Sequence, residues 1–461
     1  NGMSEGEVLF EGPSFVSAPS LSLDGKSIAF IAWNHPNMPW DNTTLWSANF
    51  DTDGKLEGLT EHNPDTGESA IDPQWDVEGN LYVLSDRNNW WSLYQVSGTE
   101  FTLLSPQPEK SEIGGPAWQV GKHYYRIRQD GSILAQVVKG AIGQLYLLDR
   151  KSNTMHVLTP ESAAIEDFVE SDSALYVIQD PQTRPGELIA LSDLSGDSPK
   201  VNIVTSSSDS ALSPDWVPTI QEVSFPVGDT AKAYGTYFPP TNPDVNAPEG
   251  SAPPLIVMIH GGPTSKASPT YSVSKYFWTS RGFGILDLNY RGSTGYGREY
   301  RHALYGEWGV TDVEDAVAGA QWLADQGLAD ADKLIIRGGS AGGYTTLAAL
   351  AFSDVFKAGA SHYGVSDLEA LAGDTHKFES RYLDQVNACL FQLEELPVPV
   401  IAAVHGFVLA GGLELMLACD MAIAAEDARI GDQHVNFGLM PGGGSTQRLP
   451  RRVGMQRAME L

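Results

Sequence analysis

The sequence predicts a β-propeller that is incomplete at its N-terminal side, followed by two successive α/β segments. Three observations lead to this fold class. The first half of the 461-residue chain consists of short β-rich runs separated by Asp-Gly, Pro and Asn. Uninterrupted apolar strands followed by helices begin near residue 255, a pattern typical of a parallel sheet that is buried on both faces. The composition changes again near residue 385, because all eleven tryptophans lie before that point.

A repeated unit indicates the propeller. Residues 19–30, PSLSLDGKSIAF, recur as residues 73–84, PQWDVEGNLYVL, and more loosely as residues 116–125, PAWQVGKHYY. Each copy places a glycine hairpin turn before an alternating strand. A period near ~45 residues with several strands in each repeat indicates propeller blades, and roughly four such blades fit before residue 225. The alternative is a β-sandwich whose turns resemble one another by coincidence.

The composition is that of a folded acidic protein. Its formal net charge of −29 argues against a nucleic-acid partner or an anionic membrane surface. No apolar run approaches the ~20 residues of a membrane span, and the N-terminus lacks the features of a signal peptide. Cys389 and Cys419 are too few for a disulfide framework, so a cytoplasmic location is expected. Neither these cysteines nor His62, His123 and His156 have metal-ligand spacing, so no metal or cofactor is expected.

The second region begins after a loop rich in Pro, Asn and Gly at residues 239–254. Its first strand is expected at Leu255–Ile259 and ends in His260-Gly261-Gly262-Pro263, where the glycine pair allows backbone N–H groups to face a ligand. The next strand is expected over residues 283–289. Thr311-Asp312-Val313-Glu314 then has the pattern of a capping box at the start of a helix.

The centre of this region is the stretch Lys333–Leu350, KLIIRGGSAGGYTTLAAL. A short apolar strand, a glycine turn with Ser340 at its apex and a helix form the context of a nucleophile elbow in an α/β-hydrolase. The flanking glycines permit a strained backbone that exposes the Ser340 hydroxyl and directs the Ala341 N–H toward a developing oxyanion. The alternative is an ordinary strand-to-helix turn that carries GxSxG by chance. A further strand is expected at residues 356–361.

Three ordered motifs carry a family resemblance: HGGP at 260–263, NYRGSTGYG at 289–297 and GGSAGGY at 338–344. Behind a propeller they resemble the prolyl oligopeptidase family, in particular its acyl-aminoacyl peptidase and dipeptidyl aminopeptidase branch. The resemblance covers about residues 10–384. It implies a serine peptidase whose propeller selects short peptides as substrates.

The same resemblance implies roles for three residues. Ser340 matches the nucleophile, and the N–H groups of Ala341 and Gly262 match the two oxyanion donors. The family's Asp and His follow the nucleophile at much greater distances, so the polar residues after Ser340 are interpreted as structural: His362, Asp367, Asp374 and His376. Because a serine without a general base is a weak nucleophile, the activity is expected to be impaired.

The third region resembles another family. PVIAAVHGFVLAGGLELMLACD, AEDARIG and FGLMPGGGSTQRLPRRVG resemble the enoyl-CoA hydratase/isomerase (crotonase) family over about residues 392–461. The resemblance implies an acyl-CoA ligand, with Gly411 as an oxyanion donor at a helix start and Glu414 as the first catalytic carboxylate. His434 occupies the position of the second carboxylate. The last helices are expected to start at Ser445 and Met455.

The chain is therefore expected to contain a partial propeller at 1–225, a truncated α/β-hydrolase domain at 226–384 and a partial crotonase-like segment at 385–461. A fusion or a misjoined reading frame explains this order better than an evolved bifunctional enzyme. The leading functional hypothesis is an impaired serine peptidase. The alternatives are an acyl-CoA enzyme formed by the C-terminal segment and a non-catalytic propeller that binds peptides.

Overall fold

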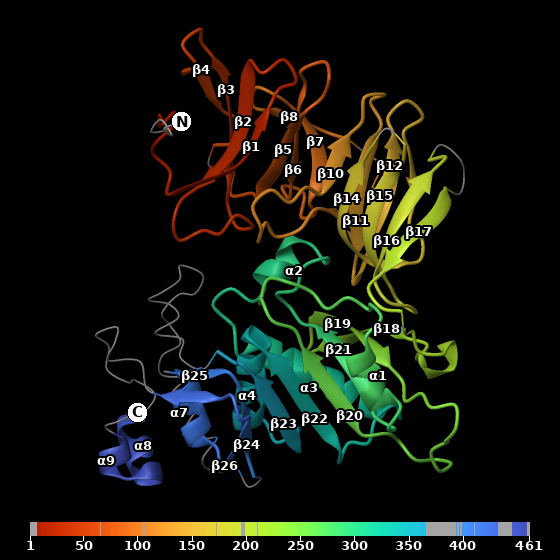
Figure 1. The fold of residues 1–461 in the computed structure, drawn as a ribbon, viewed down its shortest axis with the longest axis vertical. Coiled ribbons are helices and arrows are strands. Elements are labelled where there is room, and N and C mark those ends of the chain that lie inside the picture. Colours follow the sequence, from red (N-terminus) through yellow and green to blue (C-terminus); the bar gives the residue numbers. More distant parts are fainter. Residues whose placement is uncertain are drawn as a thin grey trace. The chain divides into compact units, whose positions relative to one another are not determined.

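The computed structural model describes residues 7–64, 66–104, 107–171, 173–194, 199–209, 211–365, 393, 396, 399–409, 411–431 and 445–458. They belong to two compact units (Figure 1). Unit 1 contains Asn1–Leu212, Ser268–Tyr271 and Thr294–Arg301, and unit 2 contains the rest of the chain. Two short segments from the second half of the sequence are therefore part of the first unit.

Unit 1 contains four antiparallel sheets in its described residues, and they follow one another along the chain (Figure 1). The first sheet is β1 (Phe15–Leu21), β2 (Ser27–Trp33), β3 (Thr44–Phe50) and β4 (Leu56–Glu61). The second is β5 (Ala70–Trp75), β6 (Leu81–Ser85), β7 (Ser92–Ser97) and β8 (Glu100–Leu103). The third is β9 (Glu112–Ile113), β10 (Tyr125–Ile127), β11 (Ile133–Lys139), β12 (Ile142–Asp149) and β13 (Thr154–Val157). The fourth is β14 (Ser162–Glu170), β15 (Leu175–Pro181), β16 (Glu187–Ser192) and β17 (Lys200–Ser206).

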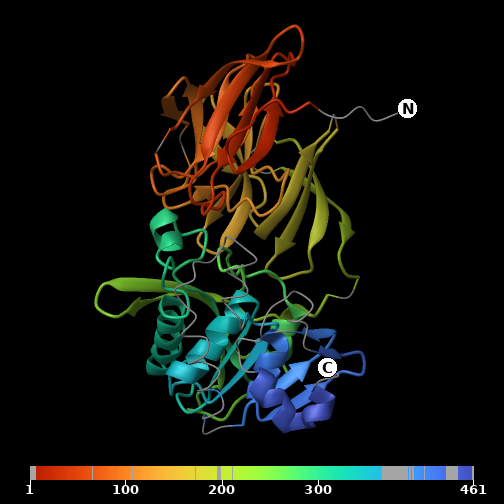
Figure 2. The same cartoon turned by 90° about the vertical axis from the view of Figure 1, so that its left-hand side faces the viewer.

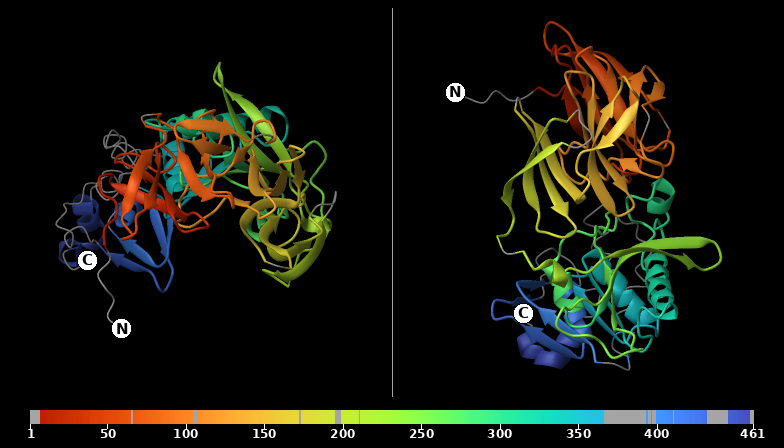
Figure 3. Two further views of the ribbon diagram at one scale, coloured as in Figure 1. Left: turned by 90° about the horizontal axis from the view of Figure 1, so that it is seen from above. Right: turned by 90° about the vertical axis from the view of Figure 1, so that its right-hand side faces the viewer.

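Consecutive sheets of unit 1 pack against each other as propeller blades do. Strand β5 contacts the first sheet and β10 of the third, and β12 contacts β14 of the fourth. One apolar cluster runs through the first three sheets and includes Leu45, Leu84 and Tyr125. A second cluster joins the third and fourth sheets through residues such as Leu145 and Val177. The predicted bladed architecture is therefore confirmed, and the four sheets are visible from red to yellow-green in Figure 3.

The first two sequence repeats form the predicted hairpins. Gly25 and Gly79 adopt φ values of 70° and 82° in the turns that lead into β2 and β6, a region that favours glycine. The predicted hairpin in the third repeat is wrong, because a strand begins only at Tyr125. There the Tyr124 N–H donates to the Asp72 carboxylate at 2.8 Å instead of to a neighbouring strand.

Unit 2 is built on a six-stranded sheet with the order β18-β19-β21-β20-β22-β23. Figure 2 shows the same ribbon turned by 90°. The strands are β18 (Gln221–Val227), β19 (Ala231–Phe238), β20 (Leu255–Ile259), β21 (Gly284–Asn289), β22 (Leu334–Gly339) and β23 (Ala358–His362). The first two pairings are antiparallel, and the remaining three are parallel. Strands β20, β21, β22 and β23 lie where the sequence predicts strands, with ends that differ by no more than a few residues.

Helices pack on this sheet and form the core of unit 2. They are α1 (Val273–Thr279), α3 (Thr311–Asp325) and α4 (Ala341–Phe352). The short helix α2 (Arg298–His302) belongs to unit 1 except for its last residue. Residues of α3 and α4 share one apolar cluster with the sheet residues Val257 and Leu286. The predicted capping box is wrong. Thr311 is already helical, the cap residue is Val310, and the Gly309 N–H instead donates to the Asp312 carboxylate at 2.6 Å.

The C-terminal segment forms small α/β pieces within unit 2. β24 (Ile401–Val404) pairs in parallel with β26 (Met421–Ala424), and β25 (Phe407–Leu409) with β27 (Arg429–Gly431). The helices are α7 (Gly411–Ala418), α8 (Ser445–Val453) and α9 (Met455–Ala458), so the predicted helix starts in this last part are confirmed. Among the residues described, no helix has the length and apolar character needed to cross a bilayer.

Candidate active site

The turn between β22 and α4 has the geometry of a nucleophile elbow. Ser340 adopts φ 54° and ψ −122°, a backbone conformation that non-glycine residues rarely occupy. A Cβ atom on Gly338 would lie 2.2 Å from the Gly342 carbonyl oxygen, and one on Gly342 would lie 2.4 Å from the Ile259 carbonyl oxygen. Only glycine fits at these two positions, so the sequence GGSAGG allows strand and helix to approach closely on both sides of the serine.

Backbone hydrogen bonds hold this turn in place. The Ser340 N–H donates to the His362 carbonyl at 3.1 Å, at the end of the neighbouring strand β23. The Ser340 carbonyl accepts from the N–H groups of Gly343 at 3.0 Å and Val365 at 3.2 Å. The side chain is exposed. Within the described parts of the chain, no group forms a hydrogen bond with the Ser340 hydroxyl.

The glycine loop after β20 lies against the serine. A Cβ atom on Gly261 would lie 3.2 Å from the Ser340 Cβ and 3.8 Å from its Oγ. Gly262 follows with φ 130°, and a Cβ there would lie 2.8 Å from the Thr264 nitrogen. Ala341, the first residue of α4, is 2% exposed. A helix start and a glycine loop beside one serine are the elements from which an oxyanion hole is built.

His260 is a functional-site residue to which the sequence alone assigned no role. Its ring stacks on Tyr290 with the ring centres 4.4 Å apart. Its Nδ1 lies 2.8 Å from the Gly261 carbonyl oxygen, and its Nε2 lies 2.8 Å from the Ser293 hydroxyl. Because a carbonyl can only accept, the neutral ring carries its proton on Nδ1. Burial lowers the pKa of His260 to about 4, so the imidazole supports the glycine loop as a neutral group.

Tyr290 and Ser293 complete this support, and both come from the NYRGSTGYG motif after β21. The Tyr290 hydroxyl donates to the His260 carbonyl at 3.1 Å. Ser293 is fully buried. The motif therefore contributes the residues that hold the HGGP loop, a relation that the spacing of the two motifs in the sequence could not reveal.

His362 accepts the Ser340 N–H through its backbone carbonyl, and its side chain is only partly buried. Burial is the main reason that the pKa of this ring is lowered, and the nearby positive charge of Arg337 acts in the same direction. The other polar residues considered after the nucleophile lie outside the described residues: Asp367, Asp374 and His376. Cys389 and His434 also lie outside them.

The crotonase-like residues lie on α7. Gly411 is the first residue of this helix, and Glu414 follows in its first turn. Glu414 is 1% exposed, although glutamate side chains are rarely buried to this extent. The apolar residues Leu413 and Leu417 of the same helix pack against Leu449 of α8.

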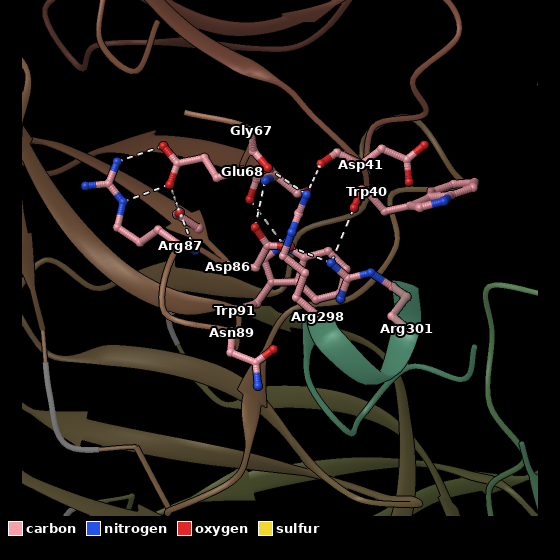
Figure 4. A network of polar contacts seen from close by, with 12 residues as sticks. Trp40, Asp41, Gly67, Glu68, Asp86, Arg87, Asn89, Trp91, Arg298 and Arg301 are labelled. Carbon is pink, nitrogen blue, oxygen red and sulfur yellow. Dashed lines mark hydrogen bonds and ion pairs between the residues drawn. The ribbon is translucent and has the colours of Figure 1, made fainter. Parts of the chain in front are cut away.

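Unit 1 contains a buried polar network, drawn in Figure 4, that the sequence did not predict. The segment Thr294–Arg301 belongs to this unit, and its Arg298 and Arg301 both form ion pairs with the fully buried Asp86. Arg301 is also fully buried, and its guanidinium lies 4.0 Å from the centre of the Trp91 ring. Its Nη1 atom lies 3.9 Å from Glu112 Oε1. Burial raises the pKa of the Glu112 carboxyl.

Backbone groups extend this network over several blades. Arg298 donates to the carbonyls of Asp41 at 2.7 Å and Gly67 at 2.6 Å. The Gly295 N–H donates to Glu112 Oε2 at 2.8 Å, and the Glu299 N–H donates to the Asn89 side chain at 2.7 Å. A segment of eight residues is thereby joined to turns and strands of the first three sheets.

A serine on a positive-φ turn between a parallel strand and a helix, in one chain with a bladed β unit, defines the class of α/β-hydrolases that carry a propeller. Residues 269–393 match the model of the prolyl oligopeptidase family. A puromycin-hydrolysing peptidase structure from Mycobacterium tuberculosis is similar with 33% identity and a TM-score of 0.83, covering 92% of this chain and 68% of that one. The chain belongs to the prolyl oligopeptidase family.

Two curated relatives match shorter parts. Dipeptidyl aminopeptidase BIII of Pseudoxanthomonas mexicana is 35% identical over 134 residues, which are 29% of this chain and 19% of that protein. Residues 353–461 match the enoyl-CoA hydratase/isomerase model. Enoyl-CoA isomerase/hydratase fer4 of Mycosarcoma maydis is 53% identical over 81 residues, which are 17% of this chain and 30% of that protein. The chain thus matches less than a third of the length of either relative.

Proposed function

We propose that this chain acts on short peptides by acyl transfer through Ser340, as a serine peptidase whose activity is impaired because the sequence offers no identifiable triad Asp and His. The observation that carries the proposal is the backbone of Ser340, held at φ 54° between β22 and α4 with its hydroxyl exposed. This conformation is costly, and such strain is concentrated at functional sites. The similarity to a puromycin-hydrolysing peptidase and a dipeptidyl aminopeptidase supports short peptides as the substrate class.

In the proposed reaction, Ser340 Oγ attacks the carbonyl carbon of the substrate and the carbonyl oxygen becomes an oxyanion. The N–H groups of Ala341 and Gly262 are the proposed donors to that oxyanion. The serine proton must pass to a base and then to the leaving amine. His260 is unsuitable as this base, because both ring nitrogens have other partners and burial lowers its pKa to about 4.

A fluorophosphonate probe tests the proposal directly, because it reacts with an activated serine hydroxyl. We expect the folded chain to be labelled slowly, and we expect Ser340→Ala to abolish the labelling. Ser251→Ala is the matched control, since Ser251 is an exposed serine of the same unit and its loss should change nothing. Folded protein that remains unlabelled under prolonged exposure to the probe would refute the serine-nucleophile assignment.

A second candidate function is acyl-CoA chemistry at the C-terminal segment. It is favoured by the family match over residues 353–461 and by the burial of Glu414 in the first turn of α7. In this proposal Gly411 supplies an oxyanion donor and Glu414 moves a proton. The assay is the loss of crotonyl-CoA absorbance. Glu414→Gln should remove any activity and Glu426→Gln, an exposed carboxylate of the same segment, should retain it.

The two assays also address a non-catalytic role. If neither Ser340 labelling nor crotonyl-CoA turnover is observed, while titration with short peptides still gives saturable binding, the propeller unit is the functional part of the chain. Isothermal titration calorimetry with tripeptides measures that outcome without depending on turnover.

A further inference from the structure

The strongest unassigned feature of unit 2 is a carboxyl group buried beside the nucleophile helix. Asp312 lies in the first turn of α3 and has no exposed surface. Its Oδ1 accepts the Gly309 N–H at 2.6 Å, and its Oδ2 accepts the Thr345 hydroxyl. Thr345 belongs to α4 and is also fully buried. One carboxyl group therefore joins the starts of two helices, and one of them begins directly after Ser340.

Thr345 has two acceptors within reach. Besides Asp312, the carbonyl oxygen of Ala341 lies 3.3 Å from Thr345 Oγ1, one helical turn earlier in α4. A threonine hydroxyl has a single proton, so it donates to one of these acceptors at a time. Bonding to the carbonyl four residues earlier is the usual alternative for a threonine within a helix, and it slightly bends the helix.

We propose that Asp312 is a positioning residue for the Ser340–Ala341 turn and that it acts through a proton-dependent exchange of the Thr345 hydrogen bond. In the ionised state, Asp312 accepts the Thr345 O–H, which ties α4 to α3. When a solvent proton is bound on Asp312 Oδ2, the carboxyl O–H donates to Thr345 Oγ1. The Thr345 O–H then turns to the Ala341 carbonyl, and the first turn of α4 gains an internal bond.

The surroundings of Asp312 place this exchange near neutral pH. Burial is the main cause that raises the pKa of Asp312 to about 6, and the carboxylate of Asp315 on the same helix acts in the same direction. From the chain after β21, Tyr290 faces Asp312 as a neutral group, because burial keeps its pKa well above the ordinary value. The Arg291 guanidinium pairs with Asp315 at 2.7 Å. On α4, the Tyr344 ring packs against the Trp308 ring at a tilt of 60°, with the ring centres 4.8 Å apart.

The link to catalysis rests on the proposed function, whereas the exchange itself does not. Ala341 supplies both the proposed oxyanion N–H and the carbonyl that competes for the Thr345 proton. A change in the first turn of α4 is therefore expected to alter the reactivity of Ser340. A net hydrogen bond contributes ~0.5–1.5 kcal/mol, which corresponds to a change of about 2- to 10-fold in rate.

Threonine-methyl NMR of the full chain between about pH 5 and pH 8 tests the exchange without turnover. The Thr345 signal, assigned by its loss in Thr345→Val, should shift with a midpoint near pH 6. Asp312→Asn should remove this titration. Asp325→Asn, an exposed carboxylate at the other end of α3, should leave it unchanged. A Thr345 methyl signal that does not shift over this range overturns the proposal.

Fluorophosphonate labelling over the same pH range tests the consequence for the elbow. The wild-type rate should show an inflection near pH 6 that Asp312→Asn and Thr345→Val both lack. If no labelling occurs at any pH while the Thr345 methyl titrates, the proposed function fails and the hydrogen-bond exchange stands. If labelling retains its inflection in both variants, Asp312 is not a positioning residue.

Discussion

At the scale of single residues, the backbone of Ser340 is the most informative feature. A non-glycine residue in such a rare conformation costs about 1–3 kcal/mol. The conformation persists because the backbone packs so closely at Gly338 and Gly342 that neither position has room for a side chain. The Ser340 carbonyl also accepts hydrogen bonds from the N–H groups of Gly343 and Val365. The surrounding turn thus determines the conformation of the serine, whatever side chain that residue carries.

Replacing the serine by glycine should therefore stabilise the protein. Ser340→Gly removes the positive-φ strain, and we expect the free energy of unfolding to rise by about 1 kcal/mol after the greater entropy of the unfolded glycine is subtracted. Ser340→Ala is the matched control, since alanine experiences the same strain. Urea denaturation of the three proteins measures the effect. Equal midpoints for the glycine and alanine variants would show that the turn is unstrained.

The buried carboxyl of Asp312 gives a pH dependence of stability. Its pKa is raised to about 6 from an ordinary value of 3.8. Between these two values the folded state binds more protons than the unfolded state, so stability falls as the pH rises. From pH 5 to pH 7.5 the loss from this group is about 1 kcal/mol. Asp312→Asn should show a smaller fall in urea midpoint over this range than wild type. A fall in urea midpoint equal to that of wild type would contradict the raised pKa of Asp312.

Local sequence patterns predicted the turn that carries Ser340 but not the residues that support it. The elbow was predictable because a strand, a glycine turn and a helix are adjacent in the sequence. His260, Asp312 and Thr345 act through partners that are 33 residues away in the chain, as in the contacts His260–Ser293 and Asp312–Thr345. Such pairs become visible only when the parallel strands bring their ends to the same edge of the sheet.

At the scale of elements, the segment 294–301 is the least predictable part of the fold. Its sequence lies between strands of the second unit, and yet its arginines form ion pairs with Asp86 of the first. No periodicity marks such a segment, because its structure depends on buried charges and backbone donors. Helix starts in the C-terminal segment were predictable by contrast, since Ser445 follows a run of three glycines and Met455 follows Gly454.

The charge of Asp86 should contribute strongly to the stability of unit 1. Asp86→Asn would leave the buried Arg301 with incomplete charge compensation, and removal of one partner from a buried ion pair typically costs about 3–5 kcal/mol. Asp130→Asn is the matched control, because Asp130 forms an exposed pair with Arg128 that is worth at most about 1 kcal/mol. Urea unfolding followed by tryptophan fluorescence distinguishes the two. Similar midpoints for both variants would show that the Asp86 network is solvated.

At the scale of the whole molecule, the two family matches overlap in the region where the composition changes. The prolyl oligopeptidase match ends at residue 393 and the enoyl-CoA hydratase/isomerase match begins at residue 353, around the composition change near residue 385. Sequence predicted the order of the architectures because each carries dense local motifs. It could not predict that β18 and β19 pair with the hydrolase sheet, since their alternating pattern fits a blade equally well.

Unit 1 combines an early part of the chain with a segment that the ribosome synthesises much later. Every strand of its four sheets precedes residue 212, but the Gly295 N–H that donates to Glu112 and the Arg301 guanidinium that pairs with Asp86 lie 183 and 215 residues beyond these carboxylates. At about 5–20 residues per second, the ribosome needs roughly 10–40 s to add this length of chain. During this time the nascent blades contain two carboxylates, Glu112 and Asp86, whose arginine partner Arg301 has not yet been synthesised. A fragment that ends at Leu212 would contain all the blade strands and lack their counter-charges.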